Sequence, residues 1–207
     1  MKIIKDSQQY SLYRRRLAEA LAQKSALSSD AIEAILENSE IIEFTKNESL
    51  QQEGFPAQYL YISLTGLLRE HIAGENEEDI NILFRTGGEG FGATPSLKTG
   101  EPAVYSISTI KTSIVARCDG NTFFSLIEKY PEIVEIINTS LDQNYTTIYM
   151  RLIHLLKKDI PKQLSGEGEL SLELIEALPA YHLASYLRIT PESLSRIKKK
   201  MKDEKTI

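Results

Sequence analysis

The C-terminal part of the chain has a pattern that predicts two short helices joined by a tight turn. Leu183, Ala184 and Leu187 recur at helical spacing, so they can share one buried face. Residues 190–192 read Thr-Pro-Glu and have the features of a helix start. Thr can cap the helix, Pro fits the first position because no N–H is needed there, and Glu suits the positive end of the dipole. The range 180–200 is therefore predicted to form a helix–turn–helix.

The second predicted helix has one apolar and one polar face. Leu194 and Ile197 turn inward, and the opposite face carries side chains that can read or hold DNA. Arg can bond to the guanine edge through two N–H groups, Glu can accept from cytosine, and Ser and Lys can contact phosphates. The residues expected to contact DNA are Thr190, Glu192, Ser193, Ser195, Arg196 and Lys199. The alternative interpretation is a solvated surface helix of a small helical domain.

The spacing Thr-Pro-Glu-x-x-Ser-Arg-Ile, preceded by Leu-Ala-x-x-Leu, resembles the recognition region of the Crp/Fnr transcription regulators. In the Fnr-like branch, Glu-x-x-Ser-Arg reads the half-site, and the matching residues here are Glu192, Ser195 and Arg196. The resemblance implies a homodimer on an inverted repeat of double-stranded DNA, with RNA polymerase as a further partner. In this family the turn usually contains Gly, whereas this chain has Arg188. A left-handed turn costs a non-Gly residue about 1 kcal/mol, so either the turn is built differently or Arg188 contacts the DNA backbone.

The middle of the chain is rich in short β-type runs separated by turn residues, a spacing typical of an antiparallel jelly roll. The predicted strands are 41–44, 59–64, 67–72, 80–84, 103–110 and 113–117. Residues 60–69 resemble the strand–Gly–strand signature of cyclic-nucleotide-binding domains. In that comparison Gly66 lies in a hairpin where a Cβ does not fit.

The pocket segment of that family lacks its usual ligands in this chain. In the family, a loop carboxylate and an Arg-Ser pair hold the ribose and the cyclic phosphate. The matching positions here are Ala93, Ala103 and Val104. We therefore expect that cAMP and cGMP do not bind in the usual way, that no cofactor is bound, and that any small-molecule effector is a different compound. Candidate pocket residues, each also readable as an ordinary strand residue, are Arg69, Arg85, Ala93, Ala103, Val104, Tyr105 and Lys111.

A long apolar repeat begins at Pro131 and follows alternating steps of four and three residues. This spacing predicts a coiled-coil seam, with Asn138 at an a position where a polar residue can fix the register. The alternative is a helix buried against its own β-roll. The predicted dimer interface consists of Asn138, Leu141, Tyr145, Ile148, Leu152 and Leu155, with Val134 as the first d position.

These segments predict an α+β protein with three parts. Residues 1–130 contain N-terminal helices and a cyclic-nucleotide-binding-like β-roll, 131–158 a dimerisation helix, and 159–207 a winged helix–turn–helix domain. Within the last part, 159–170 is predicted to be a flexible hinge and 170–178 a first helix. The residues after Lys200 leave room for at most one strand of a wing.

Charge and composition favour a binding protein over an enzyme. The net charge is −5, but residues 182–202 contain six Lys and Arg against one acidic residue. The protein therefore has a local positive face that suits DNA. Neither an apolar run of about 18 residues nor a signal-peptide core is present, so a cytoplasmic location and no membrane partner are expected. A single cysteine, Cys118, excludes an internal disulfide, and the absence of a His-x-His pair argues against a metal site. Two alternatives remain: a small-molecule sensor with a vestigial helix–turn–helix, and a cupin-like enzyme.

Overall fold

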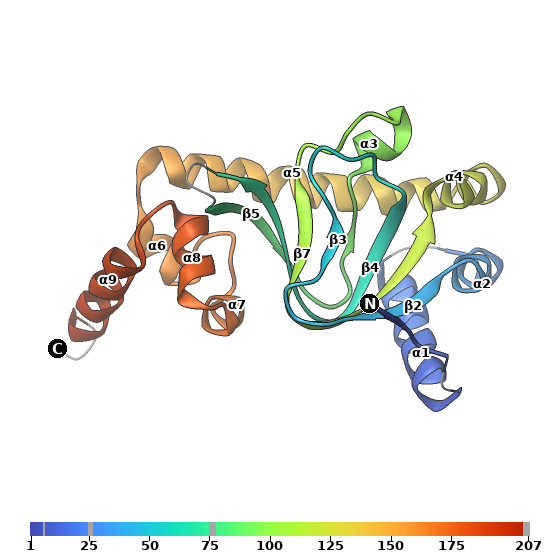
Figure 1. Cartoon of the computed structure of the whole chain (residues 1–207), viewed down its shortest axis with the longest axis horizontal. Coiled ribbons are helices and arrows are strands. Elements are labelled where there is room, and N and C mark those ends of the chain that lie inside the picture. Colours follow the sequence, from blue (N-terminus) through green and yellow to red (C-terminus); the bar gives the residue numbers. More distant parts are fainter. Residues whose placement is uncertain (6, 25–26, 75–77, 205–207) are drawn as a thin grey trace. The chain divides into compact units, whose positions relative to one another are not determined.

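The computed structural model describes residues 1–5, 7–24, 27–74 and 78–204, and it divides the chain into two compact units. The first unit contains residues 1–72 and 84–140, and the second contains 73–83 and 141–207. The three predicted parts, divided at 130/131 and 158/159, are consecutive in the chain. The two compact units are each made of two separate stretches of sequence. The tip of one β-hairpin belongs to the second unit, together with the C-terminal helices. Figure 1 labels most elements of the two units.

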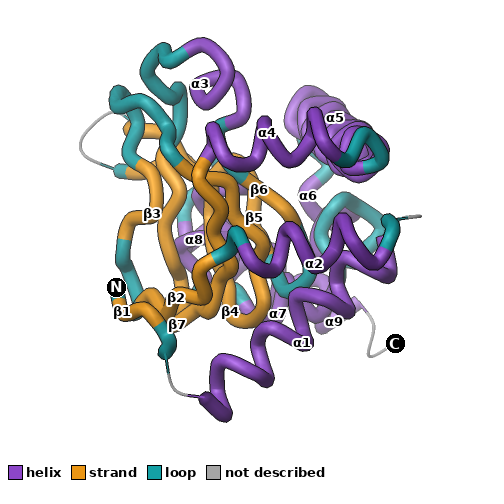
Figure 2. Tube along the Cα trace, turned by 90° about the vertical axis from the view of Figure 1, so that its right-hand side faces the viewer, coloured by secondary structure: helices purple, strands orange, loops and turns teal. Residues whose placement is uncertain are grey.

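The strands of the described residues pair in antiparallel fashion, in the order β1-β2-β7-β4-β5, with β3 on β7 and β6 on β4. Their bounds are Lys2–Ile3 (β1), Glu40–Phe44 (β2), Ser49–Gln51 (β3), Tyr59–Ala73 (β4), Asp79–Arg85 (β5), Gly90–Phe91 (β6) and Ser106–Asp119 (β7). The antiparallel β-roll predicted from the short β-rich runs is confirmed, and Figure 2 shows its strands in orange.

Two of the strands are longer than predicted. The runs 59–64 and 67–72 form the single strand β4, which passes through Gly66. The runs 103–110 and 113–117 likewise lie in one strand, β7, which begins only at Ser106. The predicted hairpin at Gly66 is therefore wrong. The reason given for glycine is right, because φ is 101° and a Cβ would lie 2.2 Å from the Ser113 hydroxyl oxygen. The pairing register is irregular at this point, so Gly66 lets two long strands approach closely instead of reversing the chain.

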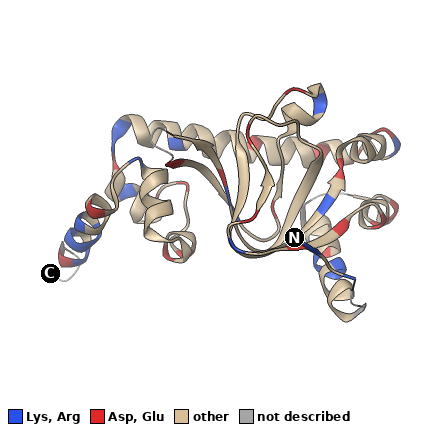
Figure 3. Cartoon of the chain, in the orientation of Figure 1, with Lys and Arg blue, Asp and Glu red and all other residues tan. Residues whose placement is uncertain are grey.

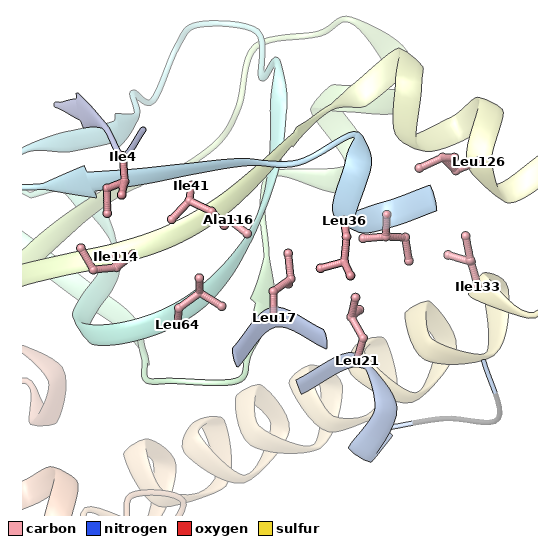
Figure 4. Close-up of a cluster of buried hydrophobic side chains, with 11 residues drawn as sticks. Ile4, Leu17, Leu21, Leu36, Ile41, Leu64, Ile114, Ala116, Leu126 and Ile133 are labelled. Carbon is pink, nitrogen blue, oxygen red and sulfur yellow. The ribbon is translucent and has the colours of Figure 1, made fainter. Parts of the chain in front are cut away.

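Helices α1 (Ser7–Lys24), α2 (Ser29–Glu37) and α4 (Gly120–Lys129) lie along one side of the strands (Figure 2). Ser28 begins α2 by accepting a hydrogen bond from the backbone N–H of Ala31 at 3.2 Å. The apolar faces of these helices meet the sheet in one buried cluster, drawn in Figure 4. Its members are Ile4, Leu17, Leu21, Ile35, Leu36, Ile41, Leu64, Ile114, Ala116, Leu126 and Ile133.

A second cluster of buried side chains comes from the strands of the β-roll. It consists of Ile42, Phe44, Tyr61, Leu68, Phe91, Ile107 and Val115. The short helix α3 (Thr94–Thr99) follows β6. This second cluster defines the interior of the β-roll, where the family resemblance would place an effector.

The long helix α5 (Ile133–Lys157) begins two residues after Pro131, close to the prediction. The predicted hinge 159–170 is partly wrong, because it contains the helix α6 (Ile160–Leu164), which Asp159 caps. The predicted helix over 170–178 is shorter and forms α7 (Leu172–Ala177). Of the residues considered for a wing strand, 201–204 are helical and 205–207 lie outside the described residues. No helix in the described part of the chain has the length and apolar character needed to span a membrane.

Candidate nucleic-acid interface and β-roll interior

The predicted helix–turn–helix is present as α8 (Ala180–Leu187) and α9 (Pro191–Glu204). On α8 the residues expected to turn inward are buried, with Leu183 fully inaccessible and Leu187 3% exposed. On α9, Leu194 is 1% exposed and Ile197 is half-buried. The two helices contact each other, so burial of these apolar side chains fixes which face of α9 remains open to solvent.

The turn between the helices has left-handed geometry although it lacks glycine. Arg188 has φ 56° and ψ 42°, and α8 ends with a hydrogen bond from the Ile189 N–H to the Ala184 carbonyl at 3.1 Å. The suggestion that Arg188 builds the turn differently is therefore wrong. The chain accepts a backbone strain of about 1–2 kcal/mol at this residue. The side chain of Arg188 is exposed, and its contact with DNA backbone stays a prediction.

Thr190 caps α9 as predicted. Its hydroxyl oxygen accepts from the backbone N–H of Ser193 at 3.2 Å and lies 3.2 Å from the Ser193 hydroxyl oxygen. The backbone N–H of Glu192 itself and the Thr190 hydroxyl lower the pKa of the Glu192 carboxyl. Glu192 is therefore an ionised acceptor at neutral pH, the state that a cytosine amino group requires.

The open face of α9 carries the predicted DNA-contacting residues. Glu192, Ser195, Arg196 and Lys199 are exposed, whereas Ser193 is half-buried. The guanidinium of Arg196 donates from Nη2 to the Ser193 hydroxyl at 3.2 Å. Figure 3 colours the Lys and Arg positions of the α9 ribbon blue. A carboxylate, hydroxyls, a guanidinium and several ammonium groups thus share one rigid element.

Inside the β-roll, a buried ion pair joins β4 to β5. Arg85 donates from Nε to the Glu70 carboxylate at 2.8 Å, and the two residues are 7% and 4% exposed. Burial disfavours the guanidinium charge, but the Glu70 carboxylate outweighs this effect and the pKa of Arg85 is raised. Tyr105 lies near both groups and donates its hydroxyl to the Gly92 carbonyl at 3.1 Å. Burial raises the pKa of the Tyr105 hydroxyl, so this group remains a donor.

The predicted pocket residues do not all lie together. Arg85 and Tyr105 are near each other, and Ala93 and Ala103 are each 3% exposed. Val104, in contrast, is 76% exposed. Arg69 donates from Nε to the Ser108 hydroxyl at 3.1 Å and is adjacent in β4 to Glu70, so it lies on the opposite face of the strand. Lys111 is exposed. Sequence reasoning missed Glu70, the residue that neutralises Arg85.

The predicted seam lies on an exposed face of α5. Leu141, Tyr145, Ile148 and Leu152 are 47–68% exposed. Asn138 is also exposed, and Leu155 is half-buried. Val134, the first d position, is exposed as well, and so are Tyr149, Met150 and Leu156 of α5. Because contiguous exposed apolar surface is unfavourable in water, this face is suited to burial against another surface.

Sequence reasoning also missed a buried polar network in the second unit. The Glu169 carboxylate accepts from the Tyr186 hydroxyl at 2.6 Å and lies 2.7 Å from His154 Nδ1. Its side chain is 2% exposed, although the segment around Glu169 was predicted to be flexible and polar. No local pattern could have indicated these partners, because Glu169 is separated from them by 15 and 17 positions. Within the described residues, no group of three or more His, Cys, Asp and Glu side chains has an arrangement suited to a metal ion.

Comparison with known proteins identifies the β-roll. Residues 41–130 match the family model of the cyclic nucleotide-binding domain. No curated protein matches the chain.

Solved structures extend the likeness beyond the β-roll. The c-di-GMP-responsive global regulator CLP of Xanthomonas campestris matches with a TM-score of 0.69 and 16% identity, over 86% of this chain and 93% of that protein. FixK2 from Bradyrhizobium japonicum gives a TM-score of 0.66 at 16% identity, over 80% and 85%. The catabolite activator protein of Thermus thermophilus gives 0.55 at 16% identity, over 86% and 85%. The chain therefore contains a cyclic nucleotide-binding domain at residues 41–130, followed by C-terminal helices in a fold like that of these regulators.

Proposed function

We propose that the protein is a dimeric, sequence-specific DNA-binding transcription regulator of the Crp/Fnr type. The observation that carries the proposal is the common exposure of Glu192, Ser195 and Arg196 on one face of α9. These side chains match the donor and acceptor groups of guanine and cytosine in the major groove. Arg196 and Glu192 would read base edges, while Ser193, Ser195, Thr190 and Lys199 would hold the DNA backbone.

The exposed apolar face of α5 supports a dimer in which two copies of α9 act together. In a two-fold dimer the recognition helices lie about 34 Å apart, one turn of B-DNA, so that they enter successive major grooves. The bound DNA would then be an inverted repeat. Selection of bound fragments from a random DNA pool tests the proposal directly. A selected inverted repeat is the expected result, and recovery of unrelated sequences would contradict sequence-specific recognition.

Arg196→Ala is expected to weaken binding to the selected operator by about 1–3 kcal/mol and to relax sequence choice at one position of each half-site, because a bidentate guanine contact is lost. Lys199→Ala is the matched control. It should weaken binding to all DNA sequences alike. It should also reduce the slope of the logarithm of the binding constant against the logarithm of salt concentration by about one unit. Fluorescence anisotropy at several salt concentrations measures both effects. Unchanged operator affinity in Arg196→Ala would show that this residue does not read bases.

The interior of the β-roll supports an effector other than a cyclic mononucleotide, or none. Ala93, Ala103 and Val104 offer neither a carboxylate for a ribose nor an Arg-Ser pair for a phosphate, and Arg85 is already bonded to Glu70. Isothermal titration with cAMP or cGMP is therefore expected to show no binding in the micromolar range. A micromolar dissociation constant for either nucleotide would refute this part of the proposal.

A further inference from the structure

Residues 79–83 of β5 belong to the same compact unit as the helix–turn–helix, and Asn81 is the most buried of them, at 1% exposed. Asn81 contacts α8 although about 100 residues separate the two in the sequence. It lies outside the face of α9 proposed to meet DNA. Any role of Asn81 in DNA binding must therefore be indirect, through its contacts with α8.

Asn81 binds one turn of α8 through both its backbone and its side chain. Its backbone N–H donates to the Ser185 hydroxyl at 3.1 Å, and that hydroxyl donates in turn to the Asp79 carbonyl at 2.7 Å. The side-chain amide donates from Nδ2 to the His182 carbonyl at 3.0 Å and lies 3.2 Å from His182 Nδ1. Rotation of α8 about its axis, or sliding along it, would break at least one of these bonds.

Arg151 of α5 completes the attachment. Its Nη2 group donates to the carbonyls of Asn81 at 2.8 Å and Tyr186 at 3.0 Å, and its guanidinium lies 4.3 Å from the centre of the Tyr186 ring. The Tyr186 carbonyl is one of the last four of α8, which have no partner within the helix and favour a positive charge. One guanidinium therefore joins α5, β5 and the end of α8.

We propose that Asn81 is a positioning residue for DNA recognition, which sets the orientation of α9 through α8 without touching DNA. The proposal rests on the proposed function. Because α8 and α9 pack together, the orientation of the recognition helix follows that of α8. In a dimer this orientation determines the distance between half-sites that both copies can read together.

The test compares Asn81→Ala with Thr109→Val. Thr109 is also 1% exposed, and its hydroxyl bonds to Thr45 and Glu48 in the first unit, so it controls for the loss of a buried polar group. Asn81→Ala should lower operator affinity about tenfold, the result of losing one or two buried hydrogen bonds. It should also reduce discrimination against an operator with one base pair inserted between the half-sites. Affinity for random DNA should not change, because the charges of α9 remain.

Hydrogen–deuterium exchange gives a readout that does not depend on DNA. Asn81→Ala should speed exchange of amides in α8 and α9, whereas Thr109→Val should not. Ser185→Ala removes only the hydroxyl between Asn81 and Asp79, so it should speed amide exchange in α8 and α9 to a smaller extent. This variant replaces Asn81→Ala in the test if Asn81→Ala does not fold. Wild-type exchange in α8 and α9 of the Asn81 and Ser185 variants would overturn the proposal. Failure of the wild-type protein to prefer its selected operator over random DNA would overturn the proposed function instead.

Discussion

Replacement of Glu70 by alanine should lower the free energy of unfolding by about 3–5 kcal/mol, because it leaves the buried Arg85 guanidinium without its closest carboxylate. Among the described residues, Glu89 also forms an ion pair with Arg85, but its carboxylate is 3.6 Å from Arg85 Nη1 and its side chain is 36% exposed. It therefore compensates only weakly. Urea unfolding followed by circular dichroism measures the change.

The double variant Glu70→Leu, Arg85→Met separates the ion pair from simple loss of packing. Removing both charges and keeping apolar volume in the β-roll should restore stability to within about 1 kcal/mol of wild type, or above it, because desolvation of the pair is no longer required. If the single and double variants were equally destabilised, the ion pair would not be the cause. The same double variant would also show whether the charges of this pair are needed for any effector response.

Ile148→Asp should dissociate the proposed dimer. Ile148 is 47% exposed and occupies a d position of the seam, so the substitution removes apolar contact in both copies and places two carboxylates opposite each other. Lost burial and the desolvation of these carboxylates should weaken association by at least about 3 kcal/mol, more than 100-fold. Sedimentation equilibrium at micromolar concentration measures the dissociation constant.

Thr146→Asp is the matched control, because it adds the same charge to an exposed residue of α5 at a b position, away from the seam. It should leave the dimer intact. A wild-type protein that sediments as a monomer at micromolar concentration would contradict the dimer, and equal dissociation of both variants would show that charge on α5, not the seam, matters. Because Ile148→Asp should dissociate the dimer, it should also lower operator affinity, since each half-site is then bound by a single copy.

Local patterns predicted the features of the fold that depend on neighbouring residues. The cap at Thr190, the inward side chains Leu183 and Leu194, and the extent of α5 all follow from helical spacing and the chemistry of helix ends. The error at Gly66 has a physical reason. Glycine serves both a reversal of the chain and a close approach of two strands, and the sequence does not distinguish these uses.

The features that the sequence did not predict depend on residues distant in the chain. The partner of Arg85 is 15 positions away on another strand, and the partners of Asn81 are about 100 positions away. A spacing pattern indicates which side chains are buried, but not which polar groups meet once they are buried. The segment around Glu169 reads as flexible and polar because it consists of Gly, Glu and Ser, yet the Glu169 carboxylate contacts buried His154 of α5 and Tyr186 of α8.

The interleaving of the two units has a consequence for dissecting this protein. A fragment that begins at residue 141 would contain α8 but not Asp79 and Asn81, so the Ser185 hydroxyl and one guanidinium bond of Arg151 would lose their acceptors. Such a truncation would also expose the surface of α8 that β5 covers. The compact unit that carries the proposed DNA-binding helices is therefore not a contiguous stretch of sequence, and an excised C-terminal piece would lack the β5 contacts that hold α8.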